Sequence, residues 1–355
     1  MEKKRNAIIA EAIVNRGGVE RQILTLLRYI DADIYTGLYD PNTAYEEFKG
    51  HNIISFLKKK LPAMLNTLYV RYKFKKLKLE GYDNYIFFGG HSTNCSRNNH
   101  PSVWYCNAPL RYLYDCYDET ANGMSFPKRV LFKIFAYFIR KSDQKAYKDI
   151  DIVLVNSKNV QKRFEKYFNS YRSVVLYAPV DTKKFKFLGQ KDYYLISSRL
   201  TPEKKVDLVV EAFQKMPDKK LIVTGDGPER EKIESLCKDY PNISYKGNVP
   251  EKELYELYGN SIAVLYVTQN EDLGSVPLEA MSAGKPCIGA NDGGMKESII
   301  PKKTGMLINH NVDEVVEAVK YLTPKRCLKM RKDCEKRGRE FSEEKWAKKI
   351  IEHLR

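Results

Sequence analysis

Residues 271–280 read EDLGSVPLEA and closely follow the apolar run IAVLYV at 262–267. The apolar run is typical of a buried strand, and residues 275–284 have the pattern of a helix. This assignment places Glu271 in the loop between strand and helix, and Glu279 near the start of the helix. Ligands of open α/β sheets bind at the carboxyl ends of the strands. The stretch therefore predicts an α/β fold with a ligand site at this loop.

The groups at this loop indicate the chemistry of the ligand. Leu273, Gly274 and Ser275 lie where a helix begins, and the backbone N–H groups of a helix start favour an anion such as phosphate. The carboxylates of Glu271 and Glu279 can accept hydrogen bonds from hydroxyls. Phosphate together with hydroxyls indicates a nucleotide sugar.

Further motifs stand along the chain in a definite order. They are RGGVER at 16–21, WYCNAPLRYLYD at 104–115, SRLTPEKKVD at 198–207, GDGPE at 225–229, GNVP at 247–250, and the pair Glu271 and Glu279 with seven residues between them. Together they resemble the retaining, nucleotide-sugar-dependent glycosyltransferases of family four. The segment 104–115 resembles the mannosyltransferase-like branch of that family. The matches span nearly the whole chain, and their specificity comes from their joint occurrence.

The resemblance implies the GT-B fold, in which two Rossmann-like domains with parallel sheets face a central cleft and the last helix crosses back to the N-terminal domain. Alternating apolar runs and helical patterns independently predict an α/β fold with mostly parallel sheets. The predicted strands are 6–11, 33–37, 52–56, 84–88, 103–106, 152–156, 173–177, 193–197, 220–224, 243–246, 262–267, 286–290 and 305–308.

A polar stretch at 181–191 is the best candidate for an interdomain linker. We therefore expect an N-terminal acceptor-side domain over residues 1–185 and a nucleotide-sugar donor-binding domain over residues 186–340. Residues 341–355 are expected to form a C-terminal helix that packs back on the N-terminal domain.

The resemblance also implies roles for four long polar side chains. Arg199 and Lys204 follow a predicted strand and would bind the donor diphosphate, neutralising charge on the leaving nucleotide. Glu279 would accept hydrogen bonds from the ribose hydroxyls. Glu271 would lie nearer the donor sugar, where it can hold a hydroxyl or support positive charge at the anomeric carbon.

Glycines and one valine complete the expected donor site. Gly17 and Gly18 close the loop after the first strand, where backbone can approach a pyrophosphate, although the full dinucleotide fingerprint G-x-G-x-x-G is missing. Gly225 belongs to the next matching turn, and Val249 to the loop that lies by the base in the resembling family.

Asn107 is expected to be catalytic, but it departs from the family pattern, which usually has His after the residue that corresponds to Cys106. An asparagine can hydrogen-bond a sugar hydroxyl but cannot titrate, so the sequence does not support a general base there. His91 and His100 are nearby alternatives, and a structural role is at least as plausible for either.

The sequence predicts no metal and no cofactor beyond the donor substrate. It has no H-E-x-x-H motif, and the two Asp-x-Asp pairs, at 31–33 and 149–151, each precede a strand and so lie at the wrong edge of the sheet. Arg199 and Lys204 would take the place of the metal.

Net charge is unevenly distributed. Of the +16 total, residues 1–180 contribute +12, with 29 Lys and Arg against 17 Asp and Glu. Two basic segments with interleaved aromatic and aliphatic residues, 56–78 and 128–148, are typical of helices that lie on anionic membrane surfaces, and a solvated basic helix is the alternative for each. Seven cysteines without a C-x-x-C pair indicate reduced thiols.

The sequence thus predicts a retaining, metal-independent hexosyltransferase, with mannose from GDP-mannose as the first choice of donor sugar and UDP- or ADP-sugars as alternatives. Its acceptor would be a glycan or a lipid-linked molecule, and transfer would follow a front-face mechanism. We expect a cytoplasmic protein, peripheral on the inner face of the membrane if the basic segments bind lipid. The alternatives are a sugar-nucleotide epimerase of the same fold and a non-enzymatic nucleic-acid-binding protein, of which the second is weak because no such motif occurs.

Overall fold

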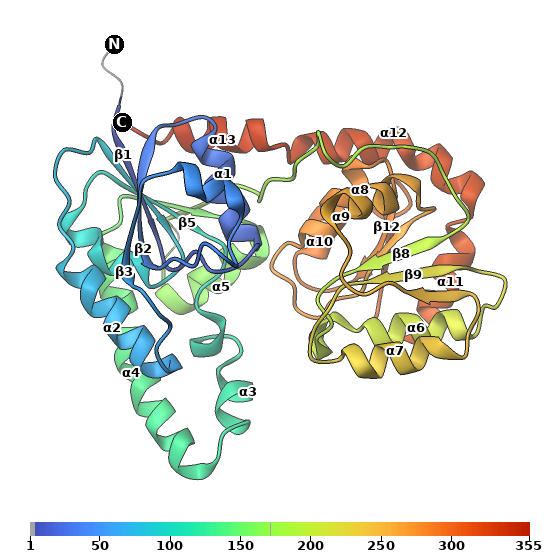
Figure 1. Ribbon diagram of the computed structural model, residues 1–355, viewed down its shortest axis with the longest axis horizontal. Helices are drawn as coiled ribbons and strands as arrows, with labels where there is room; N and C mark the ends of the chain where they lie inside the picture. The colour runs from blue at the N-terminus through green and yellow to red at the C-terminus, as the bar shows by residue number, and fades with distance from the viewer. Residues whose placement is uncertain (1–3, 171) are drawn as a thin grey trace. The chain divides into compact units, whose positions relative to one another are not determined.

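The computed structural model describes residues 4–170 and 172–355. The chain divides into two compact units: the first runs to Tyr177 and includes Ala347–Arg355, and the second is Ala178–Trp346. Each unit is a parallel β-sheet with helices on its faces (Figure 1).

The first unit contains a seven-stranded sheet in the order β3-β2-β1-β4-β5-β6-β7. Its strands are β1 (Asn6–Ala10), β2 (Ala32–Leu38), β3 (Ile53–Leu57), β4 (Asn84–Phe88), β5 (Ser102–Cys106), β6 (Ile152–Val155) and β7 (Ser173–Val175). Its main helices are α1 (Gly18–Leu27), α2 (Ala63–Lys76), α3 (Tyr117–Asn122), α4 (Phe126–Lys148) and α5 (Lys158–Phe168). Strands β1, β4 and β5 are buried along their whole length, which explains why each is apolar at every position after a first polar residue rather than alternating.

The second unit contains a six-stranded sheet in the order β10-β9-β8-β11-β12-β13. Its strands are β8 (Tyr194–Ser197), β9 (Leu221–Thr224), β10 (Ile243–Tyr245), β11 (Val264–Tyr266), β12 (Cys287–Ala290) and β13 (Gly305–Ile308). Its helices are α6 (Val206–Gln214), α7 (Arg230–Lys238), α8 (Glu251–Asn260), α9 (Ser275–Ser282), α10 (Met295–Ser298), α11 (Val312–Tyr321) and α12 (Pro324–Glu340), and α13 (Glu343–Ile351) runs on into the first unit.

The predicted α/β class with parallel sheets is confirmed. Within the described residues thirteen strands form the two sheets, and each lies within two residues of a predicted strand. Every pairing between neighbouring strands is parallel.

The segment at 181–191, which the sequence favours as the interdomain linker, belongs to the second unit. Val180 is buried, and its N–H donates to the carbonyl of Phe341 at 2.8 Å. The N–H of Lys191 donates to the carbonyl of Asn260 at 2.7 Å. Because these backbone groups are fixed to the second unit, the division between the units falls earlier, at Tyr177 and Ala178.

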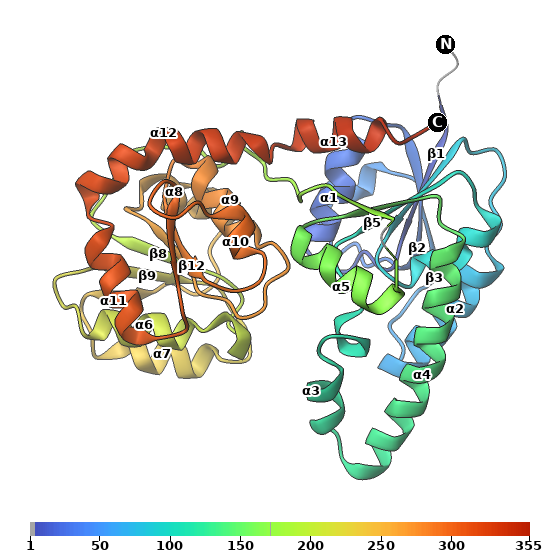
Figure 2. The ribbon, with the colours of Figure 1, turned by 180° about the vertical axis from the view of Figure 1, so that it is seen from behind.

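Helices α2 and α4 lie side by side in the first unit, as both ribbon views show (Figure 2). A buried ion pair joins them: Arg71 Nη1 of α2 lies 2.6 Å from Asp143 Oδ1 of α4, and both side chains are 6% exposed. Arg71 Nη2 also donates to Asn94 Oδ1 at 3.1 Å. Because two desolvated charges need each other, this pair fixes how α4 sits on α2.

Arg71→Met should lower the free energy of unfolding of the first unit by about 3–5 kcal/mol, since it leaves the Asp143 carboxylate buried and unpaired. Calorimetry of the full chain would measure the loss. The double variant Arg71→Met with Asp143→Leu should recover most of it, because no charge then remains unpaired. A double variant as unstable as Arg71→Met would show that the charge pair is not the cause.

Candidate functional site

The order of the second sheet defines a point where two loops diverge. From β8 the chain moves outward to β9 and β10, and it then returns to place β11 on the other side of β8. At such a switch point the loops leaving adjacent strands separate and open a crevice. The loop after β8 carries Arg199 and Lys204, and the loop after β11 carries Glu271, so the sequence placed these residues on the two sides of one crevice.

Lys204 and Glu271 form an ion pair across this switch point. Lys204 Nζ lies 2.7 Å from Glu271 Oε2, and the two side chains are 19% and 17% exposed. The hydroxyl of Tyr266, the last residue of β11, donates to the same carboxylate oxygen at 2.8 Å and accepts from Lys204 Nζ at 2.8 Å. The three polar groups therefore hold one another in a closed triangle.

Electrostatics keep Glu271 ionised. Burial opposes its charge, but the charge and hydrogen bond of Lys204, with the hydrogen bond from Tyr266, outweigh that effect and lower the pKa of Glu271. An ammonium group has three donors, of which the triangle uses two. Lys204 can thus offer its third N–H to an anion without releasing Glu271.

Backbone contacts on both sides fix the loop that carries Arg199 and Lys204. Gly225, with φ +125°, approaches Ser198 so closely that a Cβ there would lie 1.8 Å from the Ser198 carbonyl oxygen. On the other side, the N–H of Gln269 donates to the carbonyl of Glu203 at 2.8 Å. Arg199 itself is exposed at the start of this loop. A loop clamped by its neighbours can present its cations without first becoming ordered.

The start of α9 lies directly after this triangle. Gly274 precedes the helix with φ +81°, Leu273 is buried and Ser275 is exposed. The N–H of Gly294 donates to the carbonyl of Glu271 at 2.9 Å, which holds the loop against the start of α10. The helix start therefore lies beside the triangle: a Cβ on Gly274 would be 3.2 Å from the Tyr266 ring and 3.4 Å from Cγ of Glu271. Backbone N–H groups of a helix start favour an anion.

Glu279 lies one turn into α9 and is 8% exposed. The buried hydroxyl of Tyr258 donates to its Oε2 at 2.9 Å, which fixes the carboxylate. Val249 is half-buried in the loop after β10, and the N–H of Gly225 donates to the carbonyl of Gly247 at 2.9 Å, so these two loops are joined as well.

The other three expected site residues belong to the first unit. Gly17 caps α1 and Gly18 begins it, and neither has a positive φ. Burial raises the pKa of Glu20, against hydrogen bonds from backbone groups of the same loop, Val14, Asn15 and Gly17 among them. The Glu20 carboxylate therefore already accepts hydrogen bonds from the backbone of the loop that was expected to approach a pyrophosphate.

Asn107 follows β5 and is held by a reciprocal amide pair with Gln22 of α1. Asn107 Nδ2 donates to Gln22 Oε1 at 2.8 Å, and Gln22 Nε2 donates to Asn107 Oδ1 at 3.0 Å. The pair uses both ends of the Asn107 amide, so its geometry is set by α1.

Sequence analysis missed Tyr266 and Tyr258, the two tyrosines that fix the acidic side chains. Tyr266 was counted as part of an apolar strand, but its place at the carboxyl end of β11 puts its hydroxyl at the crevice. No short pattern marks Tyr258, because it contacts Glu279 from another helix. Within residues 4–170 and 172–355 no cluster of three His, Cys, Asp or Glu side chains is arranged to hold a metal ion.

Comparison with known families agrees with this geometry. Residues 179–341 match the family Glycosyl transferases group 1. This group 1 region nearly coincides with the second unit, Ala178–Trp346. The match supports the conclusion that the chain is a transferase, and so do the relatives described next.

Two curated relatives match part of the chain. Sulfoquinovosyl transferase SQD2 of Arabidopsis thaliana is 33% identical over 124 residues, which cover 34% of this chain and 24% of that protein. A GDP-mannose-dependent alpha-(1-6)-phosphatidylinositol monomannoside mannosyltransferase of Mycobacterium tuberculosis is 29% identical over 198 residues, covering 48% of this chain and 51% of that protein. The chain thus spans from about a quarter to about half the length of these relatives.

Similarity of structure extends over both units. HepE of Anabaena, solved in complex with UDP and glucose, has a TM-score of 0.72 at 14% identity, covering 98% of each chain. The likeness shows the fold, which is the GT-B fold of two Rossmann-like domains with parallel sheets.

Lys204→Met should destabilise the group 1 region by roughly 1.5–3 kcal/mol near pH 7, the range for a charged hydrogen bond. The pKa of Glu271 is lowered in the folded state, so the stabilisation is present above its ordinary pKa and is lost as pH falls through the lower folded value. The difference in unfolding free energy between wild type and variant should therefore shrink between pH 6 and pH 3. Denaturant titrations at several pH values would measure it.

Lys205→Met, one residue along the same loop, is the matched control, and its effect should be smaller at every pH, because the charge of Lys205 contributes least among the groups that lower the pKa of Asp207. A Lys204→Met deficit that stays constant down to pH 3 would contradict the role assigned to the ion pair.

Proposed function

We propose that this chain is a nucleotide-sugar-dependent glycosyltransferase that transfers a hexose to a glycan or lipid-linked acceptor. The observation that carries the proposal is the triangle of Lys204, Glu271 and Tyr266, set at a switch point beside the start of α9. It combines a cation for a diphosphate with a carboxylate for sugar hydroxyls in one crevice. The match of residues 179–341 to Glycosyl transferases group 1 supports this assignment.

The residues divide the work of transfer. Arg199 and the spare N–H of Lys204 neutralise the diphosphate as it leaves, in place of a metal ion. Glu279, held by Tyr258, accepts from the ribose hydroxyls, and Glu271 holds a hydroxyl of the donor sugar. We propose retention through a front-face mechanism, in which the leaving phosphate takes the proton of the acceptor hydroxyl. This route needs no titrating side chain at Asn107.

Mannose from GDP-mannose is our first choice of donor. The similarity to the GDP-mannose-dependent mannosyltransferase supports this choice. The structure of HepE, which has a similar fold, contains UDP and favours a UDP-sugar instead. The epimerase and nucleic-acid-binding alternatives find no support in the comparisons.

A thermal-shift screen with GDP, UDP and ADP would identify the base. The nucleoside diphosphate that binds should stabilise the chain by about 2.7 kcal/mol at a hundred times its dissociation constant. Glu279→Ala should weaken that binding by roughly 1.5–3 kcal/mol, because a charged hydrogen bond is lost. Arg199→Ala should lower turnover with the corresponding sugar by about 10²–10³-fold.

Glu256→Ala, which removes an exposed glutamate of α8, is the control for charge and should change neither quantity. Wild-type nucleotide binding in Glu279→Ala together with wild-type turnover in Arg199→Ala would sink the assignment of the donor site.

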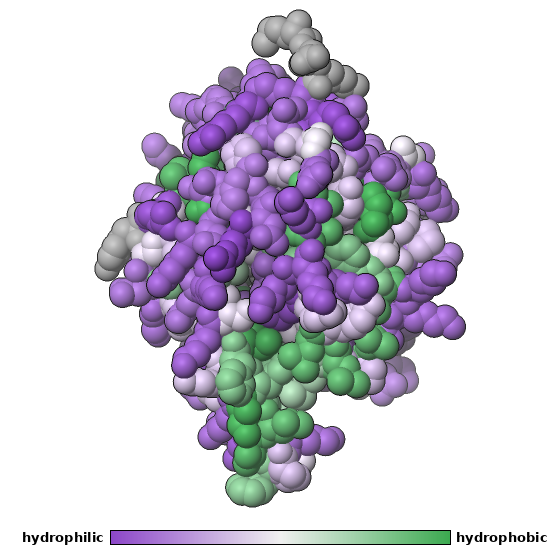
Figure 3. Space-filling view, turned by 90° about the vertical axis from the view of Figure 1, so that its left-hand side faces the viewer, coloured by the Kyte–Doolittle hydropathy of each residue, from purple (hydrophilic) through white to green (hydrophobic). Residues whose placement is uncertain are grey.

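The proposal includes attachment to the surface of an anionic membrane. Large apolar side chains of α2 and α4, each between 36% and 77% exposed, form what we call the apolar face: Leu65, Leu68, Tyr69, Tyr72, Phe126, Val130, Leu131, Ile134, Tyr137 and Phe138. Figure 3 shows apolar residues gathered at one end of this unit, below a mostly hydrophilic surface. Such a contiguous patch exceeds the scattered apolar residues of an ordinary surface.

Cations accompany the apolar face. Lys73, Lys75 and Lys76 lie in the last turn of α2, and six more Lys and Arg are spread along α4, apart from the Lys at its end. Basic residues beside apolar ones favour the interface of an anionic bilayer. No helix in the described part of the chain is long and apolar enough to cross a membrane. We therefore propose peripheral binding at the cytoplasmic face.

The double variant Ile134→Ser with Phe138→Ser should lose most binding to phosphatidylglycerol vesicles, because it removes two exposed apolar side chains, one turn apart on α4. Wild type should pellet with anionic vesicles and much less with neutral ones, and salt should weaken the binding since charges are screened within about 8 Å at physiological ionic strength. Vesicle co-sedimentation measures both effects.

Leu188→Ser with Leu328→Ser is the matched control, because these exposed leucines lie in the second unit. Equal pelleting of wild type with neutral and anionic vesicles, or of both double variants with anionic vesicles, would reject membrane attachment through this face.

A further inference from the structure

A large pocket of the first unit contains none of the residues assigned above to the donor site. Its volume is about 620 Å³, within the range of small-molecule sites. It is lined by the loops that leave the carboxyl ends of β1, β2 and β3, by α2 and by His91 after β4. Since β1 and β4 are adjacent while the chain continues from β1 to β2, the pocket begins at the switch point of the first sheet and runs to its edge.

Glu11, the residue after β1, presents a carboxylate in a fixed position. Its N–H donates to the carbonyl of Phe88 at 3.0 Å, and its carbonyl accepts from the N–H of Gly37 at 3.2 Å. Gly89, with φ +85°, lets the neighbouring strand approach, because a Cβ there would lie 2.7 Å from Cβ of Glu11. The side chain is nevertheless 36% exposed and lines the pocket. A positioned, partly open carboxylate is suited to accept hydrogen bonds from hydroxyls.

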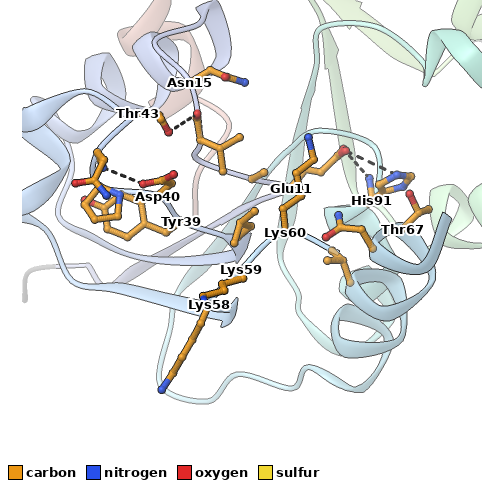
Figure 4. Close-up of a pocket in the computed structure, with 17 residues that line it drawn as sticks. Glu11, Asn15, Tyr39, Asp40, Thr43, Lys58, Lys59, Lys60, Thr67 and His91 are labelled. Carbon is orange, nitrogen blue, oxygen red and sulfur yellow. Dashed lines mark hydrogen bonds and ion pairs between the residues drawn. The ribbon is translucent and has the colours of Figure 1, made fainter. Parts of the chain in front are cut away.

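A buried chain of polar groups supports Glu11 from behind. Arg71 Nη1 lies 3.0 Å from Nδ1 of His91, and because a guanidinium only donates, Nδ1 must accept. Burial lowers the pKa of His91, against the charge of Glu11 and with that of Arg71, so the imidazole is neutral and its proton is on Nε2. That nitrogen lies 3.3 Å from the hydroxyl of Tyr112 and 3.7 Å from Glu11 Oε1, and the backbone N–H of His91 donates to Glu11 Oε2 at 3.4 Å. Figure 4 shows the Glu11 carboxylate directed at His91.

The opposite side of the pocket adds a second carboxylate, and the β3–α2 loop adds three cations. Figure 4 shows Tyr39, Asp40 and Thr43 across the pocket from Glu11, with Lys58, Lys59 and Lys60 between the two sides and Lys60 drawn nearest to Glu11. Asp40 Oδ1 accepts from the N–H of Asn42 at 3.0 Å, which leaves Oδ2 for a ligand. Lys58, Lys59 and Lys60 are exposed, and among residues 4–170 and 172–355 no ion pair or hydrogen bond occupies their ammonium groups.

We propose that this pocket binds a phosphorylated polyol, the phosphate at Lys58, Lys59 and Lys60 and the hydroxyls at Glu11 and Asp40. The inference rests on the proposed function and names the chemical class of its acceptor. Lysines alone would select any anion, and carboxylates alone would repel phosphate. Both kinds of group line one pocket, which matches a ligand that carries a phosphate as well as hydroxyls.

Helix α2 connects this pocket with the apolar face. Asn66, Thr67 and Val70 line the pocket, whereas Leu65 and Leu68 of the same helix belong to the apolar face. A phosphorylated head group on a lipid could reach the lysines while its chains stay at the face. A soluble sugar phosphate has the same recognition chemistry, so experiment must separate the two sources.

Calorimetric titration of the full chain with inositol 1-phosphate, inositol and inorganic phosphate tests the pocket. Saturating nucleoside diphosphate should be present throughout, so that phosphate sites of the second unit are filled. Inositol 1-phosphate should bind more tightly than either fragment. Replacing Lys58, Lys59 and Lys60 by Ala should weaken it about 10- to 100-fold, and Glu11→Gln should weaken it while leaving inorganic phosphate unaffected.

The matched control replaces Lys73, Lys75 and Lys76 by Ala, which removes the same charge from the exposed end of α2 and should change binding less than twofold. Circular dichroism would verify that each variant is folded. No binding of inositol 1-phosphate, or equal losses in the two triple variants, would overturn the inference. Nucleotide binding that persists in that case would leave the proposed function standing, whereas its absence would reject the proposed function itself.

Vesicles identify the source of the ligand. A preference for phosphatidylinositol over phosphatidylglycerol vesicles at equal anionic content, lost in Glu11→Gln, supports a lipid head group. Binding of the soluble probe with equal pelleting by the two vesicles supports a soluble phosphorylated acceptor.

Discussion

The reversal of strand order in each sheet is the constraint on which the rest of the structure depends. Two parallel strands lie side by side, β8 with β11 in the second unit and β1 with β4 in the first, but the chain leaves them in opposite directions. Only at such a place do the loops separate enough to admit a ligand. The Lys204–Glu271 pair stands at one reversal, and Glu11 with His91 stands at the other.

At both reversals a carboxylate is held in position by partners that leave part of it accessible to a ligand. Tyr266 and Lys204 hold Glu271, while glycine contacts on two sides and His91 hold Glu11. Fixed polar groups stabilise a ligand without the cost of reorganising when it arrives. The two reversals differ in their cations: Lys204 contacts Glu271 directly and would suit the diphosphate that we propose, whereas the cations of the first unit come from the loop after the edge strand β3.

The sequence was sufficient to predict strands but not the contacts between side chains. A parallel strand that is buried on both faces, such as β4, is mostly apolar, so its position can be predicted from the run YIFF at 85–88. The glutamates and cations of the second unit were also predictable, because family motifs place them. Their pairing was not: Lys204 and Glu271 are 67 residues apart, and only the adjacency of β8 and β11 brings them together. Glu11 lay outside every motif, since its position depends on Gly37 of strand β2 and on Gly89, which follows strand β4.

The uneven charge of the chain follows from this division of chemistry. A diphosphate site needs few cations when helix N–H groups share the load, and residues 181–355 accordingly carry 32 Lys and Arg against 28 Asp and Glu. The excess of the first 180 residues lies instead on α2, α4 and the loop before α2, where exposed apolar side chains accompany it. Charge alone would suit any polyanion, including nucleic acid. Apolar side chains that protrude between the cations gain nothing from a hydrated phosphate backbone, but they gain free energy on entering a bilayer interface, and this difference favours a lipid surface as the partner of the basic unit.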